Sequence, residues 1–565
     1  MTFLALIPLL LPLLTAVIVM TGDRADQEDN ARAGAFPIGT AFVGSIVTLF
    51  LVASEGPITV RFYDPAAMGN LAFPIGFYID RLSAVMMVLV TGVTALIYGY
   101  STGYMQQDRG YGRYLGMLAI TTSVLLCMVS SSNLLMLFIF WQMLSWLLFL
   151  LAHNHAHPAT LAGAINTFTL LRVSDMGFLA GIVLTYSLYG TLEFEPLFAR
   201  AALSPGTLTL WPSLGWEMNG ATVVTLLIFI GAMGKSAQFP IHTWLPRSLY
   251  APTPVHALLH AGIINAGGFL LNRLAPLYGL SSTTLHVVFI VGMLTAMLGA
   301  TMMLTQNDIK KTLGFSTIGQ MGYMIMECGL GAFSLAVFHL IAHGIFKATV
   351  FLNCGNVIHK ARQEPVFPPA GTDAAEGRFS PLTWSTGFVT TLLLPLVILL
   401  VTHGMLRIPL FDSQGTVIFL FFIWVTSSQA ILSLTRIHAV ASWKVSAAML
   451  LTLLLVVFTY LFAAERFTEF LYPDRAEVAS YFQAAALPGR LFDVLVIGTT
   501  GLIVLGWIYL YARAHGRTIR MPAWIDDVLA RLYVLFMNRL YIDVVYLNIG
   551  RGVTSLAQRL ERRLS

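Results

Sequence analysis

Long apolar runs recur along almost the whole chain, and they constrain its fold more than any other feature. A membrane-spanning α-helix needs roughly 20 mainly apolar residues, and about fifteen such runs can be placed. They centre on 3–20, 36–55, 83–104, 114–132, 134–152, 160–190, 222–241, 249–275, 283–304, 309–330, 332–357, 382–404, 415–435, 445–463 and 491–512. Because 57% of the residues are hydrophobic and only 10% are charged, we expect an all-α, polytopic membrane protein. The first run has no basic flank and no small-residue cleavage site, so we expect a retained helix and not a signal peptide.

The arginines and lysines between the runs predict the orientation of the chain, because loops that face the cytoplasm carry an excess of basic residues. With the N-terminus outside, the basic residues of the inward loops are Arg24, Arg32, Arg109, Arg113, Arg247, Lys310, Lys311, Lys360, Arg362, Arg378, Arg436, Lys444, Arg513, Arg517 and Arg520. Those of the outward loops are fewer, mainly Arg61, Arg200, Arg407, Arg466, Arg475 and Arg490. We therefore expect a periplasmic N-terminus, a cytoplasmic C-terminus and an odd number of spans. Nucleic-acid binding is not expected, because no basic stripe is interleaved with aromatic residues.

The composition divides the chain into segments. We expect residues 1–75 to form N-terminal transmembrane helices and residues 76–360 to form the core that carries the chemistry. Residues 361–520 are predicted to add further transmembrane helices. Residues 521–565 alternate apolar and basic positions, which is typical of an amphipathic helix at the membrane surface or of a docking surface.

The sequence has no motif for a cofactor, nucleotide or metal of its own. It contains no Rossmann glycine fingerprint, Walker loop, haem-attachment motif or iron–sulfur cysteine set. The cysteines form no paired framework and are expected to pack as small polarizable residues. They are Cys127, Cys328 and Cys354. The alternating histidines of 153–157 lack a fourth zinc ligand in their loop, so we expect a solvated polar loop or a partner contact there.

Two lysines lie inside apolar runs, where an ammonium group costs about 2.5 kcal/mol or more on insertion scales. Lys235 lies in LLIFIGAMGKSAQFP, and Lys347 lies in FHLIAHGIFKATVFL. Buried lysines among polar neighbours indicate an ion or proton path. The prolines between 240 and 254 predict broken helices, which are tolerated in membranes where they line a cavity or are buried in protein. Both lysines have histidines nearby, so 222–260 and 332–360 also predict a divergent inverted repeat of helical bundles.

Histidines at helical spacing accompany both lysines. His256 and His260 are four residues apart and should lie on one helix face, and imidazoles exchange protons near neutral pH. His339, His343 and Lys347 follow at the same spacing and should form a stripe along a second helix. Histidines that merely hydrogen-bond between helices are the alternative, but three ionisable groups in register favour a proton path.

Arg172 and Asp175 are predicted to face the bundle interior together, because a spacing of three residues places them on one side of a helix. Two roles remain open for Asp175. It could form a structural ion pair with Arg172, or it could modulate the charge of Lys235.

Several motifs, in order, resemble the large antiporter-like subunit of respiratory complex I and of Mrp antiporters. The matching segments are Gly234–Gln238, Trp244, Pro252–Val255, Leu259–Ala261, Asp308–Lys311, Ser316–Thr317, Gln320–Tyr323, His339–Lys347 and, near the end, Tyr541–Asp543. The resemblance implies that Lys235 is the central proton-carrying lysine. It also implies that His260, His343 and Lys347 belong to a hydrated polar axis.

Two departures from that family change the expectation. Complex I subunits of this type carry Trp-Glu on the fifth span, and this chain has Trp141-Gln142. Since Gln142 cannot ionise, we expect Lys235 to depend on Asp175 or on a partner's carboxylate. The family's further lysine on the twelfth span is also missing, because 381–404 has no charged residue. We therefore expect a truncated path that turns toward a bound subunit.

A shortened member without the distal lysine resembles the DabB family, the membrane subunits of bacterial inorganic-carbon transporters. The resemblance implies a DabA-like zinc partner, similar to carbonic anhydrase, that hydrates carbon dioxide to bicarbonate on the cytoplasmic side. Cation flow would drive that reaction, so the chain would be an energy-coupling subunit of the bacterial inner membrane without a cofactor or catalytic residue. Lysine and histidine favour protons over sodium, which would call for a cage of oxygen ligands. Two alternatives remain open, a proton-pumping subunit of a complex I-type quinone oxidoreductase and a membrane anchor that does not conduct.

Overall fold

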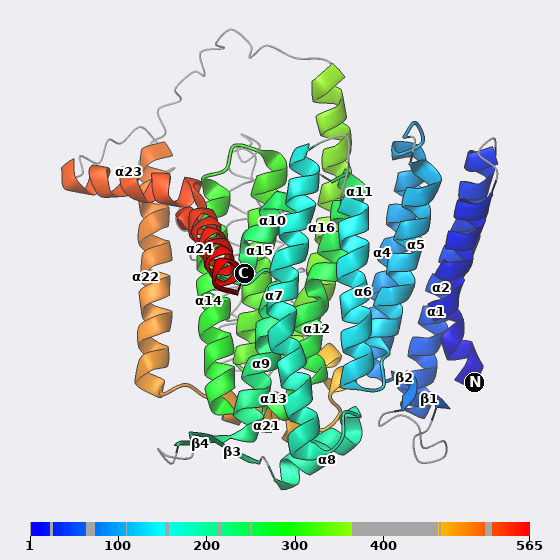
Figure 1. Ribbon diagram of the computed structural model, residues 1–565, viewed down its shortest axis with the longest axis horizontal. Coiled ribbons are helices and arrows are strands. Elements are labelled where there is room, and N and C mark those ends of the chain that lie inside the picture. Colours follow the sequence, from blue (N-terminus) through cyan, green and yellow to red (C-terminus); the bar gives the residue numbers. More distant parts are fainter. Residues whose placement is uncertain are drawn as a thin grey trace, which may run out of the picture.

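The computed structural model describes residues 2–22, 26–63, 74–108, 110–152, 158–204, 206–211, 216–248, 251–363, 462, 465–514 and 523–564. Helices that run side by side form a bundle in these ranges (Figure 1). Within them, 9 helices are long and apolar enough to cross a membrane. The chain is thus a mostly helical, polytopic membrane protein.

The predicted apolar runs coincide with helices. Every predicted run inside the described residues contains one. The runs 382–404 and 415–435, and all but Phe462 of 445–463, lie outside the described residues. The total of about fifteen spans and the inverted repeat therefore stay predictions.

The N-terminal part consists of long helices. They are α1 (Thr2–Thr21), α2 (Gln27–Glu55), α4 (Arg81–Tyr104), α5 (Tyr111–Val129), α6 (Leu134–Ala152) and α7 (Pro158–Tyr189). α1 packs against α2 and α5, and α2 packs against α4. The Thr15 hydroxyl on α1 donates to the Gly34 carbonyl on α2 at 2.8 Å. α7 packs against both α6 and α9, so these helices bring together the residues around Lys235.

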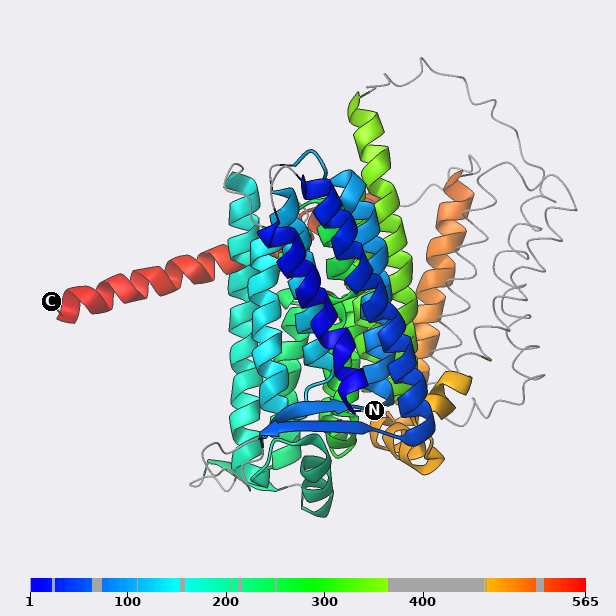
Figure 2. The same ribbon diagram turned by 90° about the vertical axis from the view of Figure 1, so that its right-hand side faces the viewer.

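Short β-hairpins were not expected from the sequence. β1 (Ile58–Tyr63) pairs with β2 (Ile75–Ile79), and β3 (Thr207–Trp211) pairs with β4 (Trp216–Asn219), both antiparallel. They lie at one end of the bundle together with α8 (Phe194–Leu203) and the N-terminus (Figures 1 and 2), and we call this the hairpin end. The all-α prediction is therefore corrected to a mostly helical fold, because short strands rich in β-branched and aromatic residues, such as ITVRFY, connect the spans.

The region after β4 forms short helices separated by breaks, as its prolines predict. They are α9 (Gly220–Lys235), η3 (Ile241–Thr243), α10 (Trp244–Arg247), α11 (Thr253–Ala261), η5 (Ile263–Asn265), α12 (Ala266–Arg273) and α13 (Ala275–Tyr278). All residues from Thr253 to Arg273 are buried. Backbone groups at the breaks find partners, since the Phe239 N–H donates to the Thr295 hydroxyl at 3.0 Å. Broken helices are stable at membrane depth when protein surrounds them in this way.

α14 (Ser282–Leu304) and α15 (Ile309–Gly329) approach each other closely along a seam of glycines. A Cβ atom at any of these glycines would collide with backbone atoms of the facing helix. They are Gly292, Gly299, Gly322 and Gly329. Small residues permit such close helix contacts in membranes. α16 (Phe333–Gln363) then packs against α11, α12 and α15.

The C-terminal part adds α21 (Arg475–Ala485), α22 (Gly489–Ala514), α23 (Ala523–Met537), η8 (Arg539–Tyr541) and α24 (Ile542–Leu564). α21 lies at the hairpin end, and α24 leaves the bundle sideways (Figures 1 and 2). The predicted amphipathic segment 521–565 thus contains helices joined at η8. The start of α24 is tied to the broken region, because the Tyr546 hydroxyl donates to the Pro240 carbonyl at 2.9 Å. Asp543 also pairs with Arg247 at 3.0 Å.

Candidate functional site

Lys235 is the last residue of α9, and its side chain is fully buried. Its Nζ donates a hydrogen bond to the Trp141 carbonyl at 3.0 Å and another to the Ser145 hydroxyl at 2.5 Å. The same nitrogen lies 5.0 Å from the centroid of the Trp141 ring. These contacts from α6 replace part of the hydration that a lysine loses at membrane depth. The sequence did not single out Ser145.

Asp175 is linked to Lys235 through Trp141. Its Oδ2 lies 2.7 Å from Nη2 of Arg172, so the ion pair that was one of its two open roles is formed. Its Oδ1 accepts a hydrogen bond from the Trp141 indole at 2.7 Å. Trp141 therefore bonds both to Asp175 and to Lys235. Gln142 follows in α6 and contacts the Asp175 carboxyl, and its effect on Lys235 stays a prediction.

The histidines of α11 face an aromatic ring of α16. The imidazoles of His256 and His260 lie 5.8 and 4.3 Å from Phe351, centroid to centroid, and 6.2 Å from each other. Both ring nitrogens of His260 are buried and have no hydrogen-bond partner among the described protein atoms. Buried polar atoms in native proteins bond to protein or to ordered water. We therefore expect His260 to contact water.

The predicted stripe of His339, His343 and Lys347 is present on α16, and all three side chains are buried. The rings of His339 and His343 are 6.4 Å apart. Lys347 Nζ donates to the Ser316 hydroxyl on α15 at 2.8 Å. The ring nitrogens of His343, like those of His260, lack a partner in the described part of the chain. Because α16 packs against α11, the structure brings His260, His343 and Lys347 close together.

Sequence reasoning missed Glu327, a carboxylate beside this stripe. Glu327 lies on α15 and is 4% exposed. Its Oε2 is 3.2 Å from Nδ1 of His339, and the Nε2 of the same ring is 2.9 Å from Oε1 of Gln320. The available signal was an acidic residue inside the apolar segment GYMIMECGL, where a charge is as costly as a lysine.

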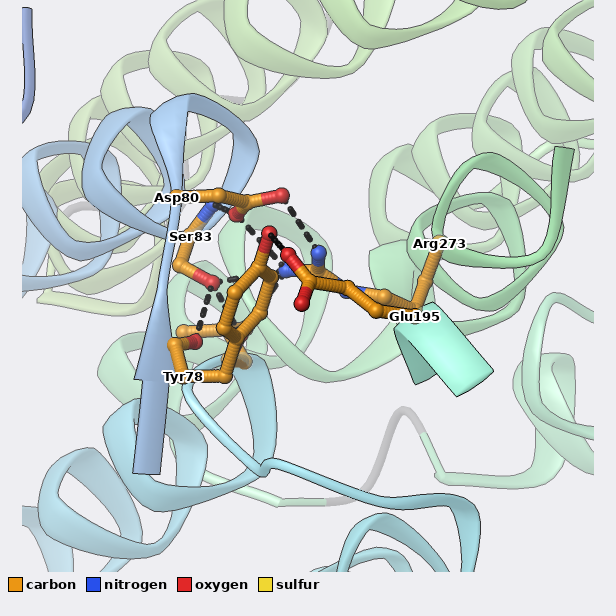
Figure 3. Close-up of polar contacts among 6 residues, drawn as sticks. Tyr78, Asp80, Ser83, Glu195 and Arg273 are labelled. Carbon is orange, nitrogen blue, oxygen red and sulfur yellow. Dashed lines mark hydrogen bonds and ion pairs between the residues drawn. The ribbon is translucent and has the colours of Figure 1, made fainter. Parts of the chain in front are cut away.

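A buried ion pair at the hairpin end was also missed (Figure 3). Arg273, the last residue of α12, donates to both carboxylate oxygens of Asp80 at 2.6 and 3.0 Å and to the Ser83 hydroxyl at 2.6 Å. Asp80 also caps the N-terminus of α4 by accepting from the Ser83 N–H at 2.9 Å. Beside it, the Tyr78 hydroxyl donates to Glu195 at 3.1 Å. The cluster fixes the end of the α11–α12 segment against α4 and β2.

The pKa of Asp80 lies below its ordinary value. Burial raises this pKa, but the Arg273 guanidinium and the hydrogen bonds from Arg273 and Ser83 together outweigh burial. The carboxylate is therefore ionised near neutral pH, and under these conditions Asp80 and Arg273 form an ion pair.

The ionisable residues form two neighbouring groups inside the bundle, one around Lys235 and one on α11 and α16. We call Lys235, His260, His343 and Lys347, with the residues that contact them, the polar axis. Buried groups of this kind, bridged by water, can pass protons through a membrane. In the described ranges, no cluster of three or more His, Cys, Asp or Glu side chains could hold a metal ion. The histidines of 153–157 lie outside the described residues.

A comparison with protein families decides the identity of this bundle. The family model described as NADH:quinone oxidoreductase/Mrp antiporter, TM, matches residues 131–428. The chain belongs to this antiporter family. The N-terminal region of complex I chain 5 matches residues 66–115 as well.

Curated relatives of this chain include an inorganic carbon transporter subunit and subunits of quinone oxidoreductases. The probable inorganic carbon transporter subunit DabB1 of Halothiobacillus neapolitanus is 38% identical over 487 residues, which cover 85% of this chain and 86% of that protein. NADH-quinone oxidoreductase subunit L of Neisseria meningitidis is 36% identical over 348 residues, which cover 61% of this chain and 51% of that protein. The match to DabB1 thus covers most of both proteins, whereas the match to subunit L covers 61% of this chain and 51% of that protein.

Solved structures show the antiporter-like fold. A chain of the Mrp complex from Dietzia has a TM-score of 0.56 and 23% identity, with 98% of this chain and 60% of that chain covered. A chain of respiratory complex I from Thermus thermophilus has a TM-score of 0.59 and 17% identity, with 86% and 100% covered. The similarity to the solved members of the family therefore extends beyond the polar axis to most of the chain.

Proposed function

We propose that this antiporter-family chain is the proton-conducting membrane subunit of an inorganic carbon transporter. Proton flow through the chain would drive a second subunit to accumulate bicarbonate. The observation that carries the proposal is the match to DabB1 of Halothiobacillus neapolitanus, which covers 85% of this chain and 86% of that protein. Buried lysines and histidines of the polar axis support conduction, since such groups at membrane depth mark ion and proton pathways.

In this proposal Lys235 is the central proton carrier. Hydrogen bonds to the Trp141 carbonyl and the Ser145 hydroxyl hold its ammonium group, and neither of these partners is a carboxylate. Protons pass between Lys235 and Lys347 by way of water near His260 and His343. Residues that support this path are His256, His339, Arg172, Asp175 and Gln142.

The partner in this proposal is a DabA-like protein with a zinc ion, which hydrates carbon dioxide on the cytoplasmic side. The chain itself supplies coupling, and it contributes neither the zinc site nor a catalytic residue. The basic residues of the loops favour a periplasmic N-terminus in a bacterial inner membrane. The hairpin end, where the N-terminus lies, then faces the periplasm, and the partner docks at the opposite end.

The proposal is tested by expressing the chain with and without its zinc-containing partner in a strain that needs carbon dioxide for growth. We expect intracellular bicarbonate to rise only with both proteins, and to fall when an uncoupler collapses the proton gradient. A complex that carries Lys235→Met should assemble and fail to accumulate bicarbonate. Uptake that persists under the uncoupler without a sodium gradient would exclude cation-driven coupling.

The second candidate is a proton-pumping subunit of a quinone oxidoreductase. The 36% identity to subunit L of Neisseria meningitidis over 61% of this chain favours it. Purification of the native complex separates the two, because a quinone-reducing assembly without a zinc protein would support the second. Absence of proton flux from proteoliposomes that contain the whole complex would instead indicate an anchor that does not conduct.

A further inference from the structure

Glu327 lies where the stripe on α16 approaches the hairpin end. α15 ends at Gly329 and α16 begins at Phe333, so the turn between them lies at that end (Figure 1). With 1.5 Å of rise per residue, Lys347 lies about 21 Å and His339 about 9 Å from the start of α16. Glu327 is in the last turn of α15. Ionisable groups therefore continue from the polar axis toward the membrane surface at the hairpin end.

Gln320 determines which ring nitrogen of His339 carries a proton when His339 contacts Glu327. Its Oε1 can only accept a hydrogen bond, so Nε2 of His339, at 2.9 Å, is the donor. The 3.2 Å contact between Nδ1 of His339 and Oε2 of Glu327 then needs one proton. That proton sits either on Nδ1, which gives an imidazolium and a carboxylate, or on Oε2, which gives a neutral imidazole and a carboxylic acid. The two residues are thus arranged to pass one proton between them.

We propose that Glu327 is the proton-carrying residue at the hairpin end of the polar axis. The inference rests on the proposed function, namely that the axis conducts protons. Glu327 takes a proton from water at the hairpin end and becomes a carboxylic acid. Its Oε2–H bond then breaks as the bond from Nδ1 of His339 to the proton forms, which restores the carboxylate. The resulting imidazolium releases its Nε2 proton through water toward His343, and exchange with water then moves the remaining proton from Nδ1 back to Nε2, which restores the hydrogen bond to Gln320.

This role gives the polar axis an end at the hairpin end that does not need the missing lysine of the twelfth span. The segment 381–404 has no lysine, arginine or carboxyl group that could exchange protons with Lys347. Glu327 provides such a group on α15, through His339, without any contribution from that segment. Tyr323 and Cys328 on α15 are titratable groups that interact electrostatically with Glu327. A phenol and a thiol are ordinarily neutral near pH 7, so neither substitutes for the carboxylate.

The test uses the complete complex in proteoliposomes, with proton flux followed by an internal pH-sensitive dye. We expect Glu327→Gln, which keeps the shape of the side chain, to lower the flux about tenfold or more, since positioned proton-transfer groups contribute at least that much. Glu327→Asp should recover part of the flux. Ser334→Ala is the matched control, because its hydroxyl bonds to Thr468 at 2.9 Å near the same end of α16, and it should leave the flux unchanged.

Infrared difference spectra give a readout that a structural role would not change. A pH step should produce a carboxyl C=O band in the wild-type complex that is lost in Glu327→Gln and shifted in Glu327→Asp. If Lys235→Met keeps full flux, the proposed function itself is wrong. If Lys235→Met abolishes flux while Glu327→Gln keeps wild-type flux, only the role of Glu327 is wrong. Should Glu327→Gln fail to fold, Glu327→Asp decides, because wild-type flux with an unshifted band would overturn the inference.

Discussion

Replacing Arg273 with methionine should lower the free energy of unfolding by about 3 kcal/mol. The guanidinium donates to Asp80 and Ser83 at 2.6 to 3.0 Å, and its side chain is 4% exposed. Removing one partner of a buried ion pair costs about 3–5 kcal/mol, because the other charge stays buried without its partner. The Asp80 side chain is 26% exposed, so water compensates part of the loss. We therefore expect the loss of unfolding free energy for Arg273→Met to lie near the lower end of this range, at about 3 kcal/mol.

A second substitution tests whether the isolated carboxylate causes this loss. Asp80→Asn removes the charge, while its side-chain oxygen can still cap α4. The double variant Asp80→Asn/Arg273→Met should therefore be more stable than Arg273→Met alone, by about 1–2 kcal/mol. Unfolding by sodium dodecyl sulfate in mixed micelles at neutral pH, followed by tryptophan fluorescence, measures both differences. A double variant that is less stable than Arg273→Met would refute the reasoning.

Arg466→Met is the control for removing an arginine. Arg466 pairs with Glu469 at 2.8 Å, but its side chain is 65% exposed. Exposed ion pairs contribute little to stability, because water solvates both charges. We therefore expect a loss of stability well below that for Arg273→Met. Equal losses for the two variants would show that burial of the Arg273 pair is not what determines its contribution.

Further predictions concern the polar axis and Asp80. Lys235→Met should keep the fold and abolish proton flux into proteoliposomes, because methionine matches the apolar body of lysine but carries no proton. Lys347→Met should impair flux strongly in the same assay, and wild-type flux would exclude Lys347 from the path. Gln142→Glu places a second carboxylate beside Asp175 and should change the pH dependence of the flux; an identical pH profile would show that Lys235 is not coupled to this position. Because the pKa of Asp80 lies below its ordinary value of 3.8, its ion pair should stabilise the fold at neutral pH, and this contribution should disappear as the pH falls through the pKa of the folded state. Unfolding curves of the wild type and Asp80→Asn should therefore converge in acid, and a constant difference would contradict this assignment.

The sequence predicts most of the described spans and the residues of the polar axis for the same reason. Apolar length and a lysine at membrane depth are local properties, so a short window around Lys235 or Lys347 contains the whole signal. Asp80 and Arg273 are 193 residues apart, and no local pattern indicates that they pair. The contacts of Trp141 could not be predicted from the sequence either, because its carbonyl and its indole form hydrogen bonds with residues on two other helices. Short strands such as β1 were missed because their β-branched residues are also common in apolar spans.

The glycine seam between α14 and α15 limits which parts of the protein can move during a transport cycle. A Cβ atom at Gly299 or Gly322 would lie less than 3 Å from backbone atoms of the facing helix, so the two helices are packed too closely to slide or turn freely against each other. α15 carries Glu327 and the hydroxyl that binds Lys347, so both groups keep a fixed position relative to α14. Rotation of side chains and exchange of water can pass protons along α15 without displacing either helix, and such local motions are faster than helix displacement. We therefore expect a conformational change that couples flux to a partner to move α14 and α15 as one unit relative to α16 and α11.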